Sequence, residues 1–249
     1  MNKDYFSNLS KKYCIPLLDI IFIALNRYGV NYGNGEEDRV RFTLKTPFTD
    51  QTFFFAVCAN TFYKSPFTIK DNMLLMNGEI LGELIDLEKD TCTETYFRNN
   101  KKSLTLNSNS RSSCRGCRFC GTYKLEAQDR EHFDNEKEMC NYIEELLIKN
   151  KLQSMRNIDD VTIVTGCFKT EEDLIKHIIS LKHALKNFDF NGTIGYVGSQ
   201  IQTKQNLYRL KNEIEKFNLL VTIEKFVERE KIMRPEKYRL TLEIAKDFL

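Results

Sequence analysis

Three cysteines lie close together near the middle of the chain, in the run RSSCRGCRFCGTYK. Two residues separate Cys114 from Cys117, and two separate Cys117 from Cys120. This short spacing lets three thiolates turn toward one centre, which is how compact loops hold iron–sulfur clusters and zinc. A cubane cluster held by three thiolates keeps one iron open to a substrate or cofactor. The spacing therefore predicts a metal centre that takes part in chemistry.

Two other interpretations of the cysteines stay open. A fourth ferredoxin-type cysteine is absent, because Lys124 occupies its position. Structural zinc usually has four protein ligands, and the fourth would have to come from a distant part of the chain. Unrelated free thiols are the last alternative. The remaining cysteines are scattered: Cys14, Cys58, Cys92, Cys140 and Cys167.

Composition excludes some classes of protein. The formal net charge is +2, and no block of basic residues indicates a nucleic-acid footprint. The apolar run at 15–25 is interrupted by Asp19 and is too short to cross a bilayer, so we expect a buried helix and no membrane partner. Eight cysteines without secretory features favour a reducing, cytoplasmic location.

The sequence pattern of residues 1–100 predicts a small α+β module. A helix is expected over about residues 8–28, followed by segments rich in β-branched and aromatic residues and by the turn signal Asn77-Gly78. Residues 94–113 are dense in Asn, Ser and Lys, which is typical of a linker, and contain one short strand, SLTLN.

Residues 101–249 alternate between strand and helix patterns. Strands are expected at 161–166, 193–198 and 219–226, and helices at about 135–151, 171–187, 204–217 and 235–248. This alternation predicts βαβ units and a parallel sheet covered by helices. Active sites of such sheets lie at the carboxyl ends of the strands. The cysteine loop follows SLTLN, so we expect it there, beside Gly166-Cys167, Gly198-Ser199 and Glu224-Lys225.

With these features, the second half of the chain resembles the radical S-adenosylmethionine (radical SAM) superfamily. Its hallmark is a three-cysteine loop after the first strand of a partial βα barrel, with an aromatic residue before the last cysteine; here Phe119 precedes Cys120. The segments VTIVTGCFKTEEDLIKHI and TIEKFVEREKIMRPEKYRLTLEIAKDFL are similar to the second and fourth βα units. The resemblance covers about residues 102–249 and implies a partial parallel βα barrel of about four units.

The chain departs from the family pattern at three points. The usual loop has three residues between its first two cysteines, where this chain has two and carries Ser113 at the alternative position. The usual glycine-glycine-glutamate turn after the second strand is replaced by Thr165-Gly166-Cys167-Phe168. The family's barrel normally has six units. A truncated gene, a partner chain or the N-terminal module would account for the missing strands.

The resemblance implies an enzyme and its cofactors. Cys114, Cys117 and Cys120 would hold a [4Fe-4S] cluster, and S-adenosylmethionine would chelate its open iron. Reductive cleavage then gives a 5′-deoxyadenosyl radical that abstracts hydrogen from an unidentified substrate, with electrons from a donor such as flavodoxin or ferredoxin. The alternative function is a non-enzymatic interaction module stabilised by zinc or an iron–sulfur cluster.

The resemblance also implies cofactor contacts. Phe119 belongs to the cluster loop, and Gly166 and Cys167 are expected to meet the methionine amino group through main-chain carbonyls. Glu224 is expected to accept hydrogen bonds from the ribose, and Ser199 or Gln200 to reach the same cofactor from the neighbouring strand.

Several charged residues are weaker candidates. Arg229 and Arg234 are candidates for the methionine carboxylate, but for each of them the sequence favours a surface salt bridge. Arg115, Arg118 and Lys124 would surround the cluster with positive charge. No histidine supports a catalytic assignment, and the pattern around Cys140 predicts a buried structural thiol.

Overall fold

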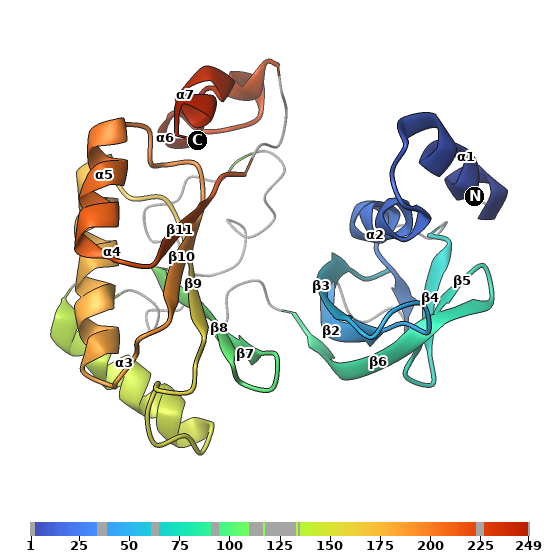
Figure 1. Cartoon of the computed structure of the whole chain (residues 1–249), viewed down its shortest axis with the longest axis horizontal. Helices are drawn as coiled ribbons and strands as arrows, with labels where there is room; N and C mark the ends of the chain where they lie inside the picture. Colours follow the sequence, from blue (N-terminus) through green and yellow to red (C-terminus); the bar gives the residue numbers. More distant parts are fainter. Residues whose placement is uncertain are drawn as a thin grey trace. The chain divides into compact units, whose positions relative to one another are not determined.

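The chain forms two compact units, Met1–Cys92 and Thr93–Leu249 (Figure 1). The structure is a computed structural model, and it describes residues 3–33, 39–60, 65–90, 95–109, 117, 133, 135–222 and 227–248. The boundary expected at residue 100 lies inside a hairpin of the second unit, because residues 96–98 pair with the strand that precedes the cysteine loop.

Unit 1 combines two helices with a curled six-stranded sheet. Its elements are α1 (Lys3–Tyr13), α2 (Leu17–Tyr28), β1 (Asn31–Tyr32), β2 (Arg39–Lys45), β3 (Thr52–Cys58), β4 (Phe67–Lys70), β5 (Met73–Met76) and β6 (Glu79–Lys89). The strand order is β1-β4-β5-β6-β2-β3, and a parallel bridge from Val30 to Ala59 joins the two sides of this half-barrel at one end.

The helix expected over residues 8–28 is two helices. Cys14 takes a left-handed conformation (φ 54°), and Pro16 directly precedes α2. Proline cannot continue a helix from the preceding turn, because its ring clashes and its nitrogen carries no hydrogen. The expected β-rich module is confirmed by the sheet, whose inward residues Val40, Phe42 and Leu44 are fully buried.

Unit 2 begins with two strands and then alternates. Its elements are β7 (Tyr96–Arg98), β8 (Ser103–Asn109), α3 (Glu136–Lys149), β9 (Asp160–Thr165), α4 (Glu171–Lys186), β10 (Thr193–Val197), α5 (Lys204–Glu213), β11 (Phe217–Leu220), a 3₁₀ turn (Arg229–Lys231), α6 (Pro235–Tyr238) and α7 (Leu242–Asp247). The last helix expected over 235–248 is therefore two short helices, with residues 239–241 between them.

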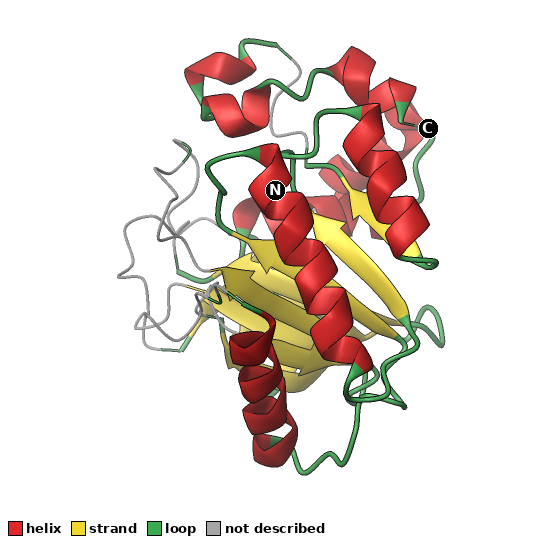
Figure 2. Ribbon diagram, turned by 90° about the vertical axis from the view of Figure 1, so that its left-hand side faces the viewer, coloured by secondary structure: helices red, strands yellow, loops and turns green. Residues whose placement is uncertain are grey.

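The sheet of unit 2 has the order β11-β10-β9-β8-β7. Strands β8 to β11 run parallel in chain order, and β7 is an antiparallel addition at one edge. Helices α3, α4 and α5 lie over one face of the sheet (Figures 1 and 2). The expected parallel sheet is thus confirmed, with all three connecting helices on the same side.

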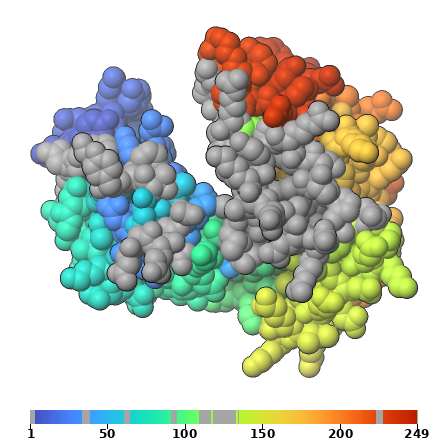
Figure 3. Space-filling view, turned by 180° about the vertical axis from the view of Figure 1, so that it is seen from behind, coloured from blue at the N-terminus to red at the C-terminus, as the bar shows by residue number. Residues whose placement is uncertain are grey.

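Local sequence explains where these helices begin. Asn135, Thr170 and Thr203 each accept a hydrogen bond from the main-chain amide three residues later, at the start of α3, α4 and α5. Such caps satisfy an amide that has no partner inside the helix, and each stabilises a helix by about 1 kcal/mol. Figure 3 shows α3 (yellow-green) and the C-terminal segment (red) at the surface of unit 2.

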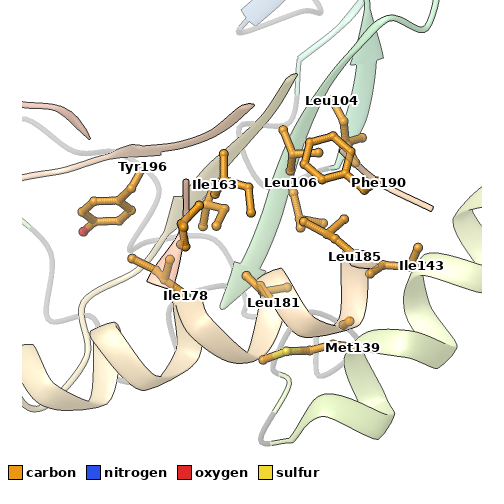
Figure 4. Close-up of a cluster of buried hydrophobic side chains, with 14 of the residues drawn as sticks. Leu104, Leu106, Met139, Ile143, Ile163, Ile178, Leu181, Leu185, Phe190 and Tyr196 are labelled. Carbon is orange, nitrogen blue, oxygen red and sulfur yellow. The ribbon is translucent and has the colours of Figure 1, made fainter. Parts of the chain in front are cut away.

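One hydrophobic core joins the sheet to the helices (Figure 4). Leu104 and Leu106 of β8 and Ile163 of β9 are fully buried against apolar residues of α3 and α4. Alternation along each strand puts every second side chain into this core, and the intervening residues face the opposite side of the sheet. None of the described helices is long and apolar enough to span a membrane.

Candidate functional site

The four parallel strands of unit 2 end at one edge of the sheet, the carboxyl edge. Residues 110–134 follow β8, residues 166–170 follow β9, residues 198–203 follow β10 and residues 221–228 follow β11. The predicted site residues Cys114, Phe119, Cys120 and Glu224 lie outside the described residues.

Cys117 is the one described member of the cysteine triad. It is buried, with 3% of its surface exposed, and its thiol is free. No group of three His, Cys, Asp or Glu side chains suited to a metal occurs among the described residues, which include only one of the three predicted ligands. The proposed ligand set stays a prediction.

The turn after β9 is fixed by its side chains. Cys167 is buried, and its thiol lies near the hydroxyl of Tyr196. The Phe168 ring packs on the imidazole of His177 in α4, with 4.8 Å between ring centroids. Both side chains therefore hold the turn that contains Gly166 and Cys167, whose carbonyls were the predicted cofactor contacts, against the core and α4.

Tyr196 fills the space between the ends of β9 and β10. Burial raises the pKa of its hydroxyl above the ordinary tyrosine value, because the phenolate would lose its hydration. The Thr165 side chain partly offsets this rise in pKa, and negative charge on the Cys167 sulfur adds to it. A β-carbon added at Gly198 would lie only 2.3 Å from the Tyr196 hydroxyl oxygen. The tyrosine ring can occupy this position only because residue 198 has no side chain.

Ser199 joins the ends of β10 and β11. It is fully buried, and its hydroxyl oxygen lies 2.8 Å from the Thr222 carbonyl oxygen, to which it donates, and 3.0 Å from the Thr222 hydroxyl. The serine thus holds two neighbouring loops together. Its predicted cofactor contact stays a prediction, but the hydroxyl proton is already donated within the protein.

Gln200 joins the ends of β9 and β10. Its side-chain amide nitrogen donates to the Phe168 carbonyl oxygen at 2.7 Å, and its side-chain oxygen accepts from the Phe168 amide at 3.0 Å. The glutamine is 3% exposed. Its carboxamide pairs with the main chain of the turn after β9 as a neighbouring strand would.

A buried hydrogen bond secures the end of β8, from which the cysteine loop departs. Ser108 is fully buried, and its hydroxyl oxygen lies 2.8 Å from Nε2 of His177. The histidine belongs to α4 and is 7% exposed. His177 therefore contacts both the end of β8 and the aromatic ring of the turn after β9, which is a structural role for one of the histidines that the sequence left unassigned.

Arg229 is a buried cation in the segment that follows β11. The residue is 7% exposed; its Nη1 donates to the Leu240 carbonyl, and Nη2 lies 3.5 Å from the Met233 sulfur. Its buried Nε has no hydrogen-bond partner, and no described carboxylate pairs with the guanidinium. Arg234, the other predicted candidate, is exposed. The surface salt bridge considered for Arg229 is therefore wrong. For Arg234, the exposed position agrees with a surface salt bridge.

The C-terminal segment is tied to the same edge of the sheet. The side chain of Gln202 donates to the Glu236 carbonyl at 2.7 Å, and Lys204 lies 3.8 Å from Asp247. One carboxylate oxygen of Glu171 accepts from the amides of Gln202 and Thr203, at 3.0 and 3.1 Å. These bonds hold the loop after β10 to the start of α4 and to α6.

The face of the sheet away from the helices is mainly polar. Three rows of side chains cross it in register: Arg98, Ser103, Asp160 and Thr193; Tyr96, Thr105, Thr162, Gly195 and Asn218; Asn107, Val164, Val197 and Leu220. Its described charges are paired, because Arg98 Nη2 lies 3.4 Å from Asp160. Some of its polar groups are bonded within the sheet, because the Ser103 hydroxyl donates to Asp160 and Arg98 Nη2 lies 3.4 Å from the Thr162 hydroxyl oxygen.

Sequence reasoning missed several of these contacts. Tyr196 looked like an ordinary strand residue, and its position over Gly198 follows only from the fold. A glycine immediately after a strand that contains a large aromatic residue was the available signal. Cys140 is half-buried and packs at the edge of the core, which agrees with the structural thiol expected there.

Comparisons with known proteins give no relative. No protein-family model matches the chain, and neither a curated protein nor a solved structure matches it.

Proposed function

We propose that unit 2 is the core of a radical SAM enzyme. The observation that carries the proposal is the cysteine triad at the start of the loop after the first of four parallel strands, in a sheet whose strand order equals the chain order. That loop begins at the carboxyl edge, where α/β enzymes place their catalytic groups. The finer fold assignment, a partial βα barrel, belongs to the same proposal.

Two features favour a partial barrel over a doubly wound sheet. A doubly wound sheet reverses its strand order at a switch point and carries helices on both faces. Here strands β8 to β11 follow one another without reversal, and α3, α4 and α5 share one face. The polar residues of the opposite face then correspond to the inner side of the barrel.

The cysteine thiolates of residues 114, 117 and 120 would hold a [4Fe-4S] cluster. When bound, the reduced cluster supplies the electron that splits S-adenosylmethionine into methionine and a 5′-deoxyadenosyl radical, which takes a hydrogen atom from the substrate. The burial of Cys117 fits this role, because it limits the access of water and oxidants to the thiolate. Gly166 and Cys167 keep their assignment as main-chain contacts and Glu224 as the ribose contact.

Arg229 fits the carboxylate of the methionine moiety. A buried guanidinium without a counter-charge is costly, and a carboxylate bound at Nε would remove part of that cost. Guanidinium also recognises carboxylates with directed, charge-assisted hydrogen bonds. The unpartnered Nε of Arg229 supports this assignment over one for the exposed Arg234.

The polar face of the sheet supports a substrate that is rich in hydrogen-bonding groups and carries no large net charge. Thr105, Thr193 and the exposed Asn218 can bind such groups, while Arg98 and Asp160 neutralise each other. An electron donor such as flavodoxin or ferredoxin remains the expected partner. A further chain pairing with the edge strand β11 also stays a prediction.

Metal content tests the proposal. After anaerobic reconstitution with iron and sulfide, the wild-type chain should hold about four iron atoms. Single Cys→Ala changes at 114, 117 and 120 should lower that content, whereas Cys140→Ala, a half-buried thiol at the edge of the core, should not. Stoichiometric zinc without iron in the wild-type chain would contradict the proposal and favour the metal-stabilised interaction module.

A further inference from the structure

Gln200 pairs with both main-chain groups of one residue in the turn after β9, as the main chain of a neighbouring strand would. Both polar atoms of its carboxamide bind the main chain of Phe168, at 2.7 Å and 3.0 Å. The glutamine is 3% exposed, so water does not compete freely for these groups. These two bonds fix the orientation of the carboxamide toward Phe168.

The rest of the turn is held from other directions. The Cys167 side chain is buried beside Tyr196, and the Phe168 ring packs on His177. Without Gln200, these two side-chain contacts would remain, but the peptide groups on either side of Phe168 could rotate. Gln200 therefore sets the direction of the two peptide groups on either side of Phe168.

We propose that Gln200 is a positioning residue that orients the main-chain carbonyl of Cys167, which shares a peptide plane with the Phe168 amide, toward the amino group of S-adenosylmethionine. This inference rests on the proposed function, and it replaces the direct contact expected for Gln200 with an indirect one. A carbonyl held in one orientation binds an ammonium group without first losing conformational freedom, so its fixation strengthens binding. Residues that orient a ligand-binding group from behind typically change affinity by about 10- to 100-fold when they are removed.

Two variants test this role. Gln200→Ala removes the carboxamide, and Gln200→Met removes it while retaining most of the side-chain volume, which protects the fold. The matched control is Asn150→Ala, whose side-chain amide also donates to a main-chain carbonyl, that of Leu146 at 2.8 Å, but at the C-terminal end of α3.

Three quantities are measured for each reconstituted full-length protein: iron content, the Kd of S-adenosylmethionine from its effect on the EPR spectrum, and hydrogen exchange at the Phe168 amide. We expect Gln200→Met to load iron normally, exchange faster at Phe168 and bind S-adenosylmethionine about 10- to 100-fold more weakly. Asn150→Ala should match the wild-type protein in all three.

The two hypotheses fail in different arms of the experiment. A wild-type protein that loads the cluster but does not bind S-adenosylmethionine overturns the proposed function, and the role of Gln200 with it. Wild-type binding with a Gln200→Met Kd within about twofold of normal overturns only the role of Gln200. Loss of the cluster in both Gln200 variants also overturns the positioning role, because a residue that acts only on the turn after β9 should not affect cluster loading.

Discussion

Replacing Gly198 with alanine should destabilise unit 2, because the new methyl group would collide with Tyr196. The added β-carbon would lie 2.3 Å from the tyrosine hydroxyl oxygen, 2.6 Å from Cζ and 3.0 Å from Cε1. Tyr196 is 3% exposed and part of the core, so its ring cannot move aside into solvent. Either the ring or the loop that carries Ser199 and Gln200 must shift.

The size of the effect follows from overpacking. Forcing additional carbon atoms into a packed core typically costs about 1–3 kcal/mol. Gly195 provides a matched control in β10, the strand that precedes Gly198: a β-carbon there would lie 3.7 Å from Leu220 Cδ1 and 3.8 Å from Thr162 Oγ1, which are ordinary contact distances. We expect Gly195→Ala to change the free energy of unfolding by no more than about 0.5 kcal/mol.

The assay is urea unfolding of the full chain followed by far-UV circular dichroism, with hydrogen exchange at β10 to assign the transition to unit 2. The exchange measurement is needed because two units can unfold separately. Gly198→Ala should lower the free energy of unfolding of unit 2 by about 1–3 kcal/mol and shift its urea midpoint downward. Adding Tyr196→Phe should restore only part of the loss, because the ring carbon at 2.6 Å remains.

Equal stability of the Gly198→Ala and Gly195→Ala proteins would refute this reasoning. It would mean that the Tyr196 ring does not occupy the space over Gly198, and the packing described for the ends of β9 and β10 would be incorrect.

Two further predictions concern buried polar groups. Folding raises the pKa of Tyr196, so the stability that its neutral hydroxyl contributes is present below the unfolded-chain pKa of about 10. As the pH rises above that value, the free energy of unfolding should fall by up to about 1.4 kcal/mol per pH unit. Tyr196→Phe should flatten this alkaline decline, and a pH dependence that the substitution leaves unchanged would count against burial of the hydroxyl. Ser108→Ala removes the 2.8 Å bond to His177 and should cost about 1–3 kcal/mol in urea unfolding, whereas unchanged stability would contradict a buried bond there.

Much of unit 2 could be predicted from sequence because its signals are local. The strands expected at 161–166 and 193–198 are observed as Asp160–Thr165 and Thr193–Val197, and the helix expected at 171–187 as Glu171–Lys186. Apolar alternation defines the strands, and a cap such as Thr170 marks where the next helix begins. The parallel arrangement follows from the alternation itself.

The contacts within the site depend on residues that are distant in the chain. Gln200 and Phe168 are 32 positions apart, and Ser108 and His177 are 69 apart. Sequence patterns place each residue near a strand end or on a helix, but they do not specify which polar atoms meet. The burial of Arg229 has the same origin, since it depends on Met233 and Leu240 folding around the guanidinium. The curled sheet of unit 1 likewise requires the Val30–Ala59 bridge, which no local signal specifies.

The most direct test of the proposed function is EPR spectroscopy of the anaerobically reconstituted, reduced wild-type protein, with and without S-adenosylmethionine. We predict a [4Fe-4S]⁺ signal whose shape and g-values change when S-adenosylmethionine is added, because the cofactor binds the iron that the three cysteines leave open. A cluster signal that S-adenosylmethionine leaves unchanged, or a protein that binds only zinc, would contradict the account.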